Sequence, residues 1–214
     1  MSLKIQRFVC NPFQENCYVV SDDTREGVVI DCGAYYPEER KALLDYICKQ
    51  NIKPLHLLAT HGHVDHNFGN DTLFNEYGLK VELHGLDEQL INSLDAQCRA
   101  FLGIPLGYDV PPTGLFFNDN FSLSFGNHSL RAIHTPGHTP GGVIFYCEDE
   151  QLAFSGDTLF RMGVGRTDFE GGSYADLRQS LRSLTQLVPE QTVMLPGHGP
   201  KTTLGEEKEF IMSL

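Results

Sequence analysis

Four side chains that commonly bind metal ions crowd into the segment LATHGHVDHN, which covers residues 58–67. His61 and His63 are two positions apart, so in an extended segment both side chains can point the same way. Asp65 and His66 begin the next turn and point toward a neighbouring spot. Because the two pairs point to adjacent places, this spacing suits two metal sites better than one.

Three more candidate ligands follow later strand-like runs, in polar or glycine-rich junctions. They are His138 in HTPGHTPGG, Asp157 in FSGDTLF and His198 in LPGHGP. Side chains at the ends of successive strands can converge on one point without leaving a buried charge unpaired. One arrangement uses all of these candidates: His61, His63 and His138 hold a first metal, Asp65, His66 and His198 hold a second, and Asp157 bridges them.

Imidazole nitrogens combined with a few carboxylates are typical of zinc in open catalytic sites, and also of iron or manganese. The predicted cofactors are therefore two divalent metal ions, with zinc first and iron or manganese as alternatives. Two metals about 3.5 to 4 Å apart can share a water, lower its pKa and present a bridging hydroxide to an electrophile. A thioester is a suitable target, because a thiolate with a pKa of roughly 8 to 9 leaves without a proton. Asp65 is expected to be a ligand that can also shuttle a proton during turnover.

The overall composition narrows the class of protein. The chain has 214 residues and is 41% hydrophobic, which suits one large domain with a substantial core. Its net charge of −12 and its lack of a basic run argue against a nucleic-acid partner. No window approaches the roughly 18 apolar residues of a membrane span, so a cytoplasmic protein without a membrane partner is expected. The six cysteines form no CxxC pair and are expected to be buried in a reducing compartment.

Strand-like and helical segments occur in two similar halves, separated by an irregular segment at 103–120. The first half predicts strands at 4–9, 17–21, 27–31 and 55–59 and helices at 37–50 and 87–100. The second half predicts strands at 121–125, 130–134, 142–147, 151–155 and 192–195 and one helix capped by Ser173. Strands followed by helices, twice over, indicate an α/β protein of four layers, with two sheets packed face to face and helices outside them.

In this order, the motifs THGHVDH, TPGHTPGG, SGDTLF and PGHGP resemble the signature of the metallo-β-lactamase superfamily. The stretches GDTLFRMGVGRTDFEGG and PGHGPKTTLGEE resemble its glyoxalase II (hydroxyacylglutathione hydrolase) branch, in the short single-domain form. The resemblance implies an αββα sandwich of two mixed sheets with helices on the outer faces and a binuclear site at one edge. It also implies the ligand roles given above. Lactam-cleaving members usually carry Cys where this chain has Asp157, so the chain does not resemble an antibiotic resistance enzyme.

The glyoxalase II resemblance implies hydrolysis of an S-acylglutathione, typically S-lactoylglutathione, to glutathione and a hydroxy acid such as D-lactate. The expected partner is therefore a small molecule, a glutathione thioester. Full-length glyoxalase II has a C-terminal helical domain that holds glutathione, whereas residues 1–214 are expected to form a single domain without one. Arg166, in GVGRTDF, aligns with a basic glutathione-contacting position of that family. The alternative is an ion pair between Arg166 and Asp168 that braces the loop.

Other enzymes fit the same residues. Persulfide dioxygenases resemble this branch and use one iron held by two histidines and an aspartate, which here would be His61, His138 and Asp157. A metal-dependent lactone or phosphodiester hydrolase and a metal-binding module without catalysis are further alternatives.

Several side chains outside the motifs also need an interpretation. His134, four residues before His138, is expected to bond a backbone carbonyl, and the alternative is that it orients one of the metal ligands. Three aromatic residues of the irregular segment either form an acyl pocket or anchor their loop: Tyr108, Phe116 and Phe117. The remaining histidines have no evident companions and are expected to be ordinary: His56, His84 and His128.

Overall fold

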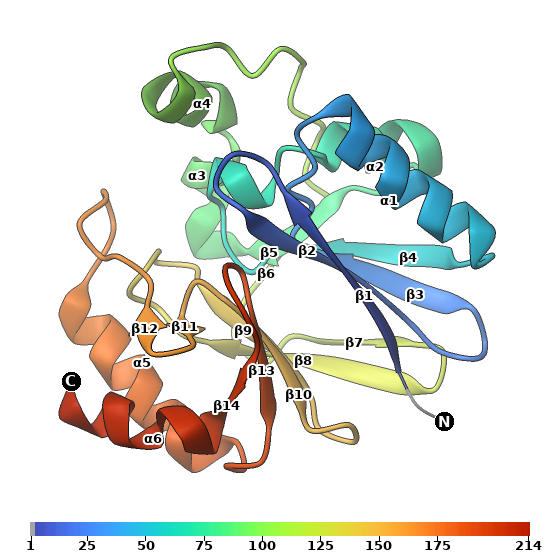
Figure 1. Cartoon of the computed structure of the whole chain (residues 1–214). Helices are drawn as coiled ribbons and strands as arrows, with labels where there is room; N and C mark the ends of the chain where they lie inside the picture. The colour runs from blue at the N-terminus through green and yellow to red at the C-terminus, as the bar shows by residue number, and fades with distance from the viewer. Residues whose placement is uncertain (1–2) are drawn as a thin grey trace.

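The structure is a computed structural model that describes residues 3–214. Two six-stranded sheets pack face to face, and helices cover the outer face of each (Figure 1). The predicted α/β sandwich of four layers is therefore confirmed.

The first sheet is built from the N-terminal half in the order in which its strands occur along the chain. Three antiparallel strands are followed by three that pair in parallel. These strands are β1 (Lys4–Cys10), β2 (Glu15–Ser21), β3 (Glu26–Ile30), β4 (Lys53–Leu58), β5 (Val81–His84) and β6 (Leu115–Phe117).

The second sheet has the order β14-β13-β10-β9-β8-β7, and its β10 and β13 pair in parallel. Both sheets are therefore mixed, as expected. The strands are β7 (Ser122–Phe125), β8 (His128–His134), β9 (Val143–Cys147), β10 (Leu152–Gly156), β13 (Val193–Pro196) and β14 (Thr202–Thr203). A small hairpin of β11 (Leu159–Phe160) and β12 (Gly163–Val164) follows β10.

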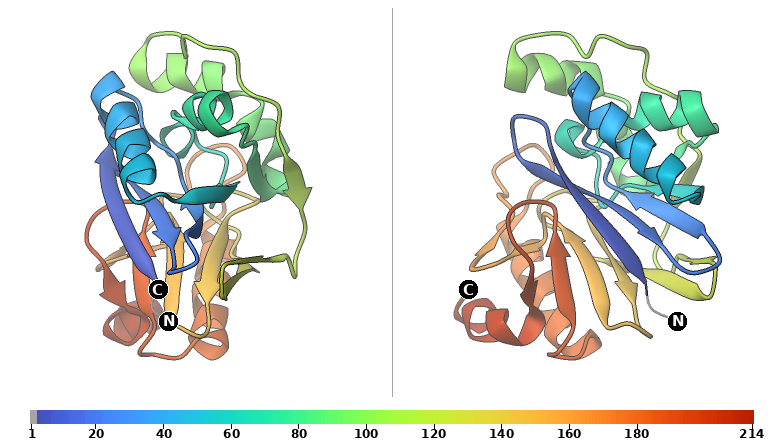
Figure 2. Two further views of the ribbon diagram at one scale, coloured as in Figure 1. Left: turned by 90° about the vertical axis from the view of Figure 1, so that its right-hand side faces the viewer. Right: turned by 45° about the vertical axis from the view of Figure 1, so that its right-hand side comes forward.

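Helices of the first half cover the first sheet, and two helices of the second half cover the second sheet, as the views in Figure 2 show. The first set is α1 (Pro37–Lys49), α2 (Asn70–Tyr77), α3 (Glu88–Ile91) and α4 (Leu94–Leu102). The second set is α5 (Tyr174–Leu187) and α6 (Leu204–Ser213). Among the described residues, no helix is long and apolar enough to cross a membrane.

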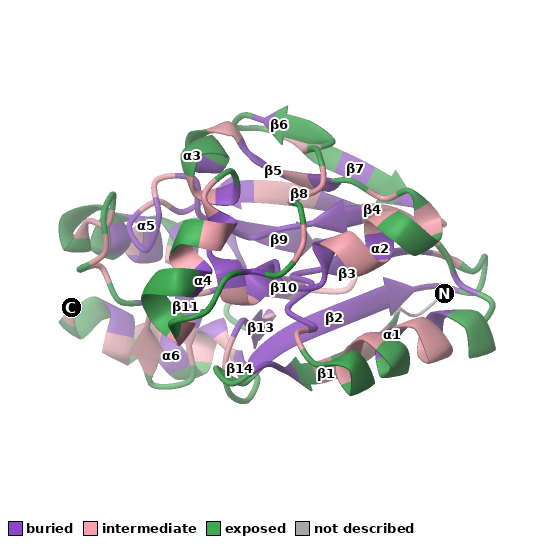
Figure 3. Cartoon of the chain, turned by 90° about the horizontal axis from the view of Figure 1, so that it is seen from above, coloured by how far each residue is buried: buried purple, intermediate pink, exposed green. Residues whose placement is uncertain are grey.

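The strands inside the sandwich are buried on both faces. Every residue of β2 and β9 is buried, which is visible for both strands in Figure 3. Between the sheets, Phe145 and Phe154 pack with residues such as Ile30 and Leu58. Strands covered on both sides lose the alternation of polar and apolar residues and become continuous apolar runs.

Helix boundaries follow local chemistry. Pro37 occupies the first turn of α1, and the Glu39 carboxylate accepts hydrogen bonds from the Tyr35 and Tyr36 backbone N–H groups. The Ser173 hydroxyl accepts from the Asp176 N–H at the start of α5, as expected. These contacts satisfy N–H groups that have no partner inside the helix.

Some predicted elements need correction. The single helix expected at 87–100 is wrong, because the chain turns between Ile91 and Leu94 and forms α3 and α4 instead. The irregular segment at 103–120 contains the short edge strand β6. Helices α2 and α6 and strand β5 were not predicted from the sequence. Helix α6 begins with a capping box. The Thr203 hydroxyl accepts a hydrogen bond from the Glu206 N–H, and the Glu206 carboxylate accepts one from the Thr203 N–H.

Two leucines of α5 provide a test of this packing. Leu184 is fully buried against the second sheet, whereas Leu187, one turn later, is 52% exposed. Leu184→Ala is expected to lower the free energy of unfolding by about 2 to 5 kcal/mol, because it removes buried contacts and leaves a cavity. Leu187→Ala is the matched control and should change it by less than about 0.5 kcal/mol. Urea unfolding of both variants measures the difference, and equal values would contradict the placement of α5.

Candidate metal centre

The candidate ligands lie together where several strands end at one edge of the sandwich. His61 and His63 follow β4, and a short 3₁₀ helix, Val64–His66, carries the next two candidates. His138 lies in the loop between β8 and β9. Because β4, β10 and β13 all end at this edge, the residues that follow them meet although they are far apart in sequence.

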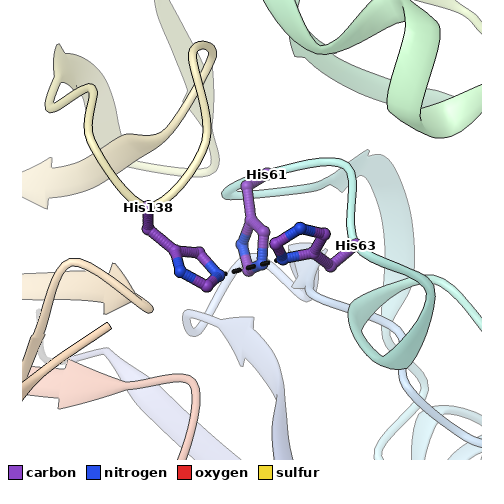
Figure 4. Close-up of side chains that lie close together, drawn as sticks. All are labelled: His61, His63 and His138. Atoms are coloured by element: carbon purple, nitrogen blue, oxygen red, sulfur yellow. Dashed lines mark hydrogen bonds between the residues drawn. The ribbon is translucent and has the colours of Figure 1, made fainter. Parts of the chain in front are cut away.

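Among the described residues, five groups of three have ligand atoms within 4.8 Å of one another, and three of these groups consist only of the candidate ligands. The first group is drawn in Figure 4, where the three imidazole rings converge from two loops. These three groups are His61, His63 and His138, then Asp65, His66 and His198, and finally His61, His66 and Asp157. The first two groups have the same members as the two sites expected from the sequence.

The outward-facing nitrogen of His61 is a hydrogen-bond donor. Its Nδ1 lies 3.1 Å from the Thr60 hydroxyl, and that hydroxyl donates its own hydrogen to Asp31 at 2.8 Å. The Thr60 oxygen can therefore only accept from His61. With the proton on Nδ1, a neutral imidazole keeps a lone pair on Nε2.

Three other histidines have the same arrangement. Their Nδ1 atoms face oxygens that can only accept, so each Nδ1 carries the hydrogen. The partners are the Asp31 carboxylate for His66 at 3.0 Å, the Arg166 carbonyl for His138 at 2.7 Å and the Phe13 carbonyl for His198 at 3.0 Å. Histidines that bind metals commonly donate their other ring N–H in this way.

The inward-facing atoms lack ordinary partners. The buried Nε2 atoms of His61 and His66 and the buried Oδ1 atom of Asp157 have no hydrogen-bond partner. His63 Nδ1 faces His138 Nε2 at 2.9 Å. Buried polar atoms without partners are costly in a folded protein unless something binds them. A set of imidazole lone pairs with carboxylates fits a divalent metal ion.

Asp157 lies between the two groups. One of its oxygens is 3.3 Å from His66 Nε2, and the other is 3.6 Å from both His138 Nε2 and His198 Nε2. Asp65 lies beside the second group only, with its Oδ2 at 3.3 Å from His198 Nε2. Asp157 therefore has the position that a bridging carboxylate would need.

The electrostatics of the cluster favour a bound cation. Burial disfavours charge on His66, but Asp157, Asp65 and Asp31 raise its pKa well above the usual value. Burial and the neighbouring histidines hold the pKa of His61 well below its usual value. The three carboxylates thus create a negative electrostatic potential around the buried imidazoles. Because burial and the neighbouring histidines disfavour protonation of His61, a bound metal ion is a suitable source of the compensating positive charge.

A pocket of about 330 Å³ opens over this cluster. Four phenylalanines and Arg166 line it together with the candidate ligands. The phenylalanines are Phe13, Phe101, Phe160 and Phe169. The arrangement combines a polar floor that can hold metals with mostly apolar walls, as is usual for small-molecule sites.

Comparison with known proteins agrees with this geometry. A family model described as the metallo-beta-lactamase superfamily matches residues 10–198.

The chain belongs to the metallo-β-lactamase superfamily.

Within the superfamily, hydroxyacylglutathione hydrolase GloC of Haemophilus influenzae is 35% identical over 96% of this chain and 95% of that protein. The crystal structure of TTHA1623 in a di-iron-bound form has a TM-score of 0.83 and 37% identity, covering 95% of this chain and 96% of that one. BLEG-1, described as a B3 metallo-beta-lactamase, has a TM-score of 0.87 and 31% identity, covering 96% and 97%.

The predicted role of Arg166 stays a prediction, but its contacts favour the ion-pair alternative. Its Nε and Nη2 donate to the two carboxylate oxygens of Asp168 at 2.7 and 2.6 Å. The guanidinium also lies 4.0 Å from the centre of the Phe169 ring. Arg166 lines the pocket, yet its charge is already paired.

The acyl-pocket interpretation of the irregular segment is wrong. Tyr108 donates a hydrogen bond to the Phe68 carbonyl at 2.7 Å and so anchors its loop. Phe117 is buried between the sheets, and Phe116 is not among the residues that line the pocket. The aromatic residues that do line it come from four separate segments, and no local sequence pattern connects them.

The other histidines are not as isolated as expected. His134 bonds the Pro140 carbonyl at 2.8 Å, as predicted, and its ring stacks on that of His84. A carboxylate faces each of the three histidines that were expected to be ordinary. The pairs are His56 with Glu82, His84 with Asp119 and His128 with Asp22.

Two buried aspartates that hold the loops were missed in the sequence. Asp31 accepts hydrogen bonds from Thr60 and His66, as described above. Its position directly after the apolar strand β3 is the sequence feature from which a buried, hydrogen-bonded carboxylate could have been predicted. Asp87 accepts from the Gly62 N–H at 2.8 Å, the Thr139 hydroxyl at 2.8 Å and the Gly141 N–H at 2.6 Å. It therefore ties the loop of His61 and His63 to the loop of His138.

Substitution of Asp87 tests this connection. In Asp87→Asn, one carboxylate oxygen becomes an NH₂ group that faces donors instead of accepting from them. We expect the metal affinity to fall about 10- to 100-fold, as it does when groups that orient ligands are altered. Competition with a chelator measures the affinity, and circular dichroism checks that the fold remains. Asp45→Asn, on the exposed surface of α1, is the control; equal affinities for the two variants would contradict the role of Asp87.

Proposed function

We propose that this chain is a binuclear metal hydrolase that cleaves a thioester, such as S-lactoylglutathione, to a thiol and a hydroxy acid. The observation that carries the proposal is the set of inward-facing lone pairs and carboxylates beneath an open pocket. Similarity to a hydroxyacylglutathione hydrolase over 96% of the chain supports the thioester as the reacting group. In this proposal residues 1–214 act as one domain.

In the proposed assignment, each of the two groups of three ligands holds its own metal ion. His61, His63 and His138 would hold one metal and Asp65, His66 and His198 the other, with Asp157 between them. When bound, two divalent metals supply a nucleophilic water at neutral pH and polarise the carbonyl of the substrate. Zinc suits this donor set, and the di-iron form of TTHA1623 supports iron as an alternative; manganese has the same ligand preferences.

The residues of the chain supply the rest of the chemistry. The outward hydrogen bonds of the histidines fix their rings, so the ligands need not reorganise during the reaction. Asp65, whose side chain is 19% exposed beside His198, can accept the proton released as water attacks and return it to solvent. The thiolate leaves without a general acid because its pKa is near 8.5. No protein nucleophile is required.

The proposed location is the cytoplasm. All six cysteines are free, and five of them are buried, which suits a reducing compartment. Burial raises the pKa of the Cys147 thiol and so keeps it in the unreactive neutral form.

Metal content gives a direct test of the two-site assignment. The protein reconstituted with zinc is expected to hold two equivalents per chain, measured by mass spectrometry of the metal. His138→Ala and His198→Ala should each hold about one, because each removes a ligand from a different group. His56→Ala, whose ring pairs with Glu82 away from the pocket, is the control and should keep both. A single equivalent in the unaltered protein would refute the binuclear assignment.

Turnover tests the reaction. Protein loaded with zinc, or separately with ferrous iron, is expected to hydrolyse S-lactoylglutathione, and His61→Ala should lower kcat/KM at least 100-fold because it removes a ligand. An oxygen electrode with glutathione persulfide tests the dioxygenase alternative, and a chromogenic lactam tests the activity named for BLEG-1. Oxygen uptake or lactam cleavage without thioester hydrolysis would overturn the proposed function.

A further inference from the structure

Phenylalanines from four separate segments surround the entrance to the pocket. We call Phe13, Phe101, Phe160 and Phe169 the aromatic collar. They come from the β1–β2 turn, the end of α4, strand β11 and the loop that follows β12. Residues so far apart in sequence form one lining because the loops at this edge of the sandwich converge.

The aromatic collar reaches from solvent to the candidate ligands. Phe101 and Phe169 are in contact, with ring centres 5.3 Å apart, and Phe169 meets the His63 ring at 5.7 Å. On the other side, Phe160 meets the His198 ring edge-on at 6.1 Å. An apolar group resting on the aromatic collar would therefore hold its neighbouring atoms over the metal centre.

The outer part of the aromatic collar is open to water. Phe13 is 38% exposed and Phe101 is 42% exposed. Large apolar side chains grouped around a pocket are informative, since single exposed residues are common but groups mark binding sites. Covering these rings would remove apolar surface from water, which favours binding.

The pocket offers little to a substrate that is recognised by its carboxylates. Among its lining residues in the described chain, Arg166 alone carries a guanidinium or ammonium group. The Nε and Nη2 atoms of Arg166 donate to Asp168, and the face of the guanidinium lies over Phe169. The glutathione moiety carries two carboxylates, which would compete with Asp168 for this single exposed guanidinium in a chain whose net charge is −12.

We propose that the aromatic collar selects the substrate by an apolar alkyl or aryl group on the thioester, and not by the carboxylates of glutathione. The inference rests on the proposed thioester hydrolysis and names its substrate class. A cavity of about 330 Å³ is near the lower limit of ligand pockets, which suits an acyl group and the adjoining sulfur. The glutathionyl part, if present, then extends into solvent.

Binding of thioethers tests the substrate class without relying on catalysis. S-methyl-, S-butyl- and S-hexylglutathione cannot be hydrolysed, and calorimetry gives their affinities for the zinc-loaded protein. Affinity should rise about fourfold for each methylene that the aromatic collar covers. The S-hexyl thioether of N-acetylcysteamine, which lacks both carboxylates, should bind within about threefold of S-hexylglutathione, because exposed ion pairs contribute little.

Two variants locate the effect. Phe169→Ala should weaken binding of the S-hexyl compound at least tenfold, and more than it weakens binding of the S-methyl compound. Phe116→Ala, which removes an equally large and partly exposed ring outside the pocket, is the matched control and should leave the whole series unchanged. Phe101→Ala provides a second variant of the aromatic collar, and metal content confirms that each protein retains its centre.

The outcomes separate this inference from the proposed function. Equal affinities along the alkyl series, no measurable binding of the S-hexyl compound, or a loss of tenfold or more without the carboxylates would overturn the inference. The same readings apply whether or not thioesters are hydrolysed. Graded thioether binding without any thioester hydrolysis would leave the role of the aromatic collar in place and refute the proposed reaction.

Discussion

The structure depends on the outward hydrogen bonds of its clustered histidines. At four of them Nδ1 donates to an acceptor oxygen, so the neutral ring has its lone pair on the inner nitrogen. Those oxygens are two backbone carbonyls, the Thr60 hydroxyl and the Asp31 carboxylate, and their positions are set by strand ends and loops. A buried cluster of lone pairs and carboxylates is costly unless a cation joins it. The fold therefore stores free energy that metal binding can release.

The sandwich explains how loops can hold such a cluster in place. The strands below it are buried on both faces and leave little freedom to the residues that follow them. Asp87 and Asp31 then join loops that the sheets alone would leave independent. Gly141 approaches Asp87 so closely that an added Cβ would lie 2.7 Å from its carboxylate. The position consequently requires glycine, and the close approach is part of the design of the site.

Much of the site was predictable because the residues that could bind metal lie just after segments that could be recognised as strands. The candidate ligands lie in the segments that follow β4, β8, β10 and β13, so their place at the sheet edge could be inferred from the sequence. The walls of the pocket could not be predicted, since Phe13, Phe101 and Phe169 meet only through tertiary packing. Asp87 was likewise hidden in a segment that was expected to be a helix. The fold was predicted in its layers, but short elements such as β5 and β6 were missed because neighbouring strands, not local propensity, define them.

The residue Arg166 has two separate tasks that use different atoms. Its carbonyl accepts the hydrogen bond that orients His138, while its side chain extends over Phe169 on the outer wall. Every amino acid has the same carbonyl, so the side chain at this position is free to vary without disturbing the histidine. Changes of substrate preference can therefore accumulate at the rim of the pocket during evolution while the inherited centre is preserved. This division within one residue offers a physical reason why a single scaffold can serve many substrates.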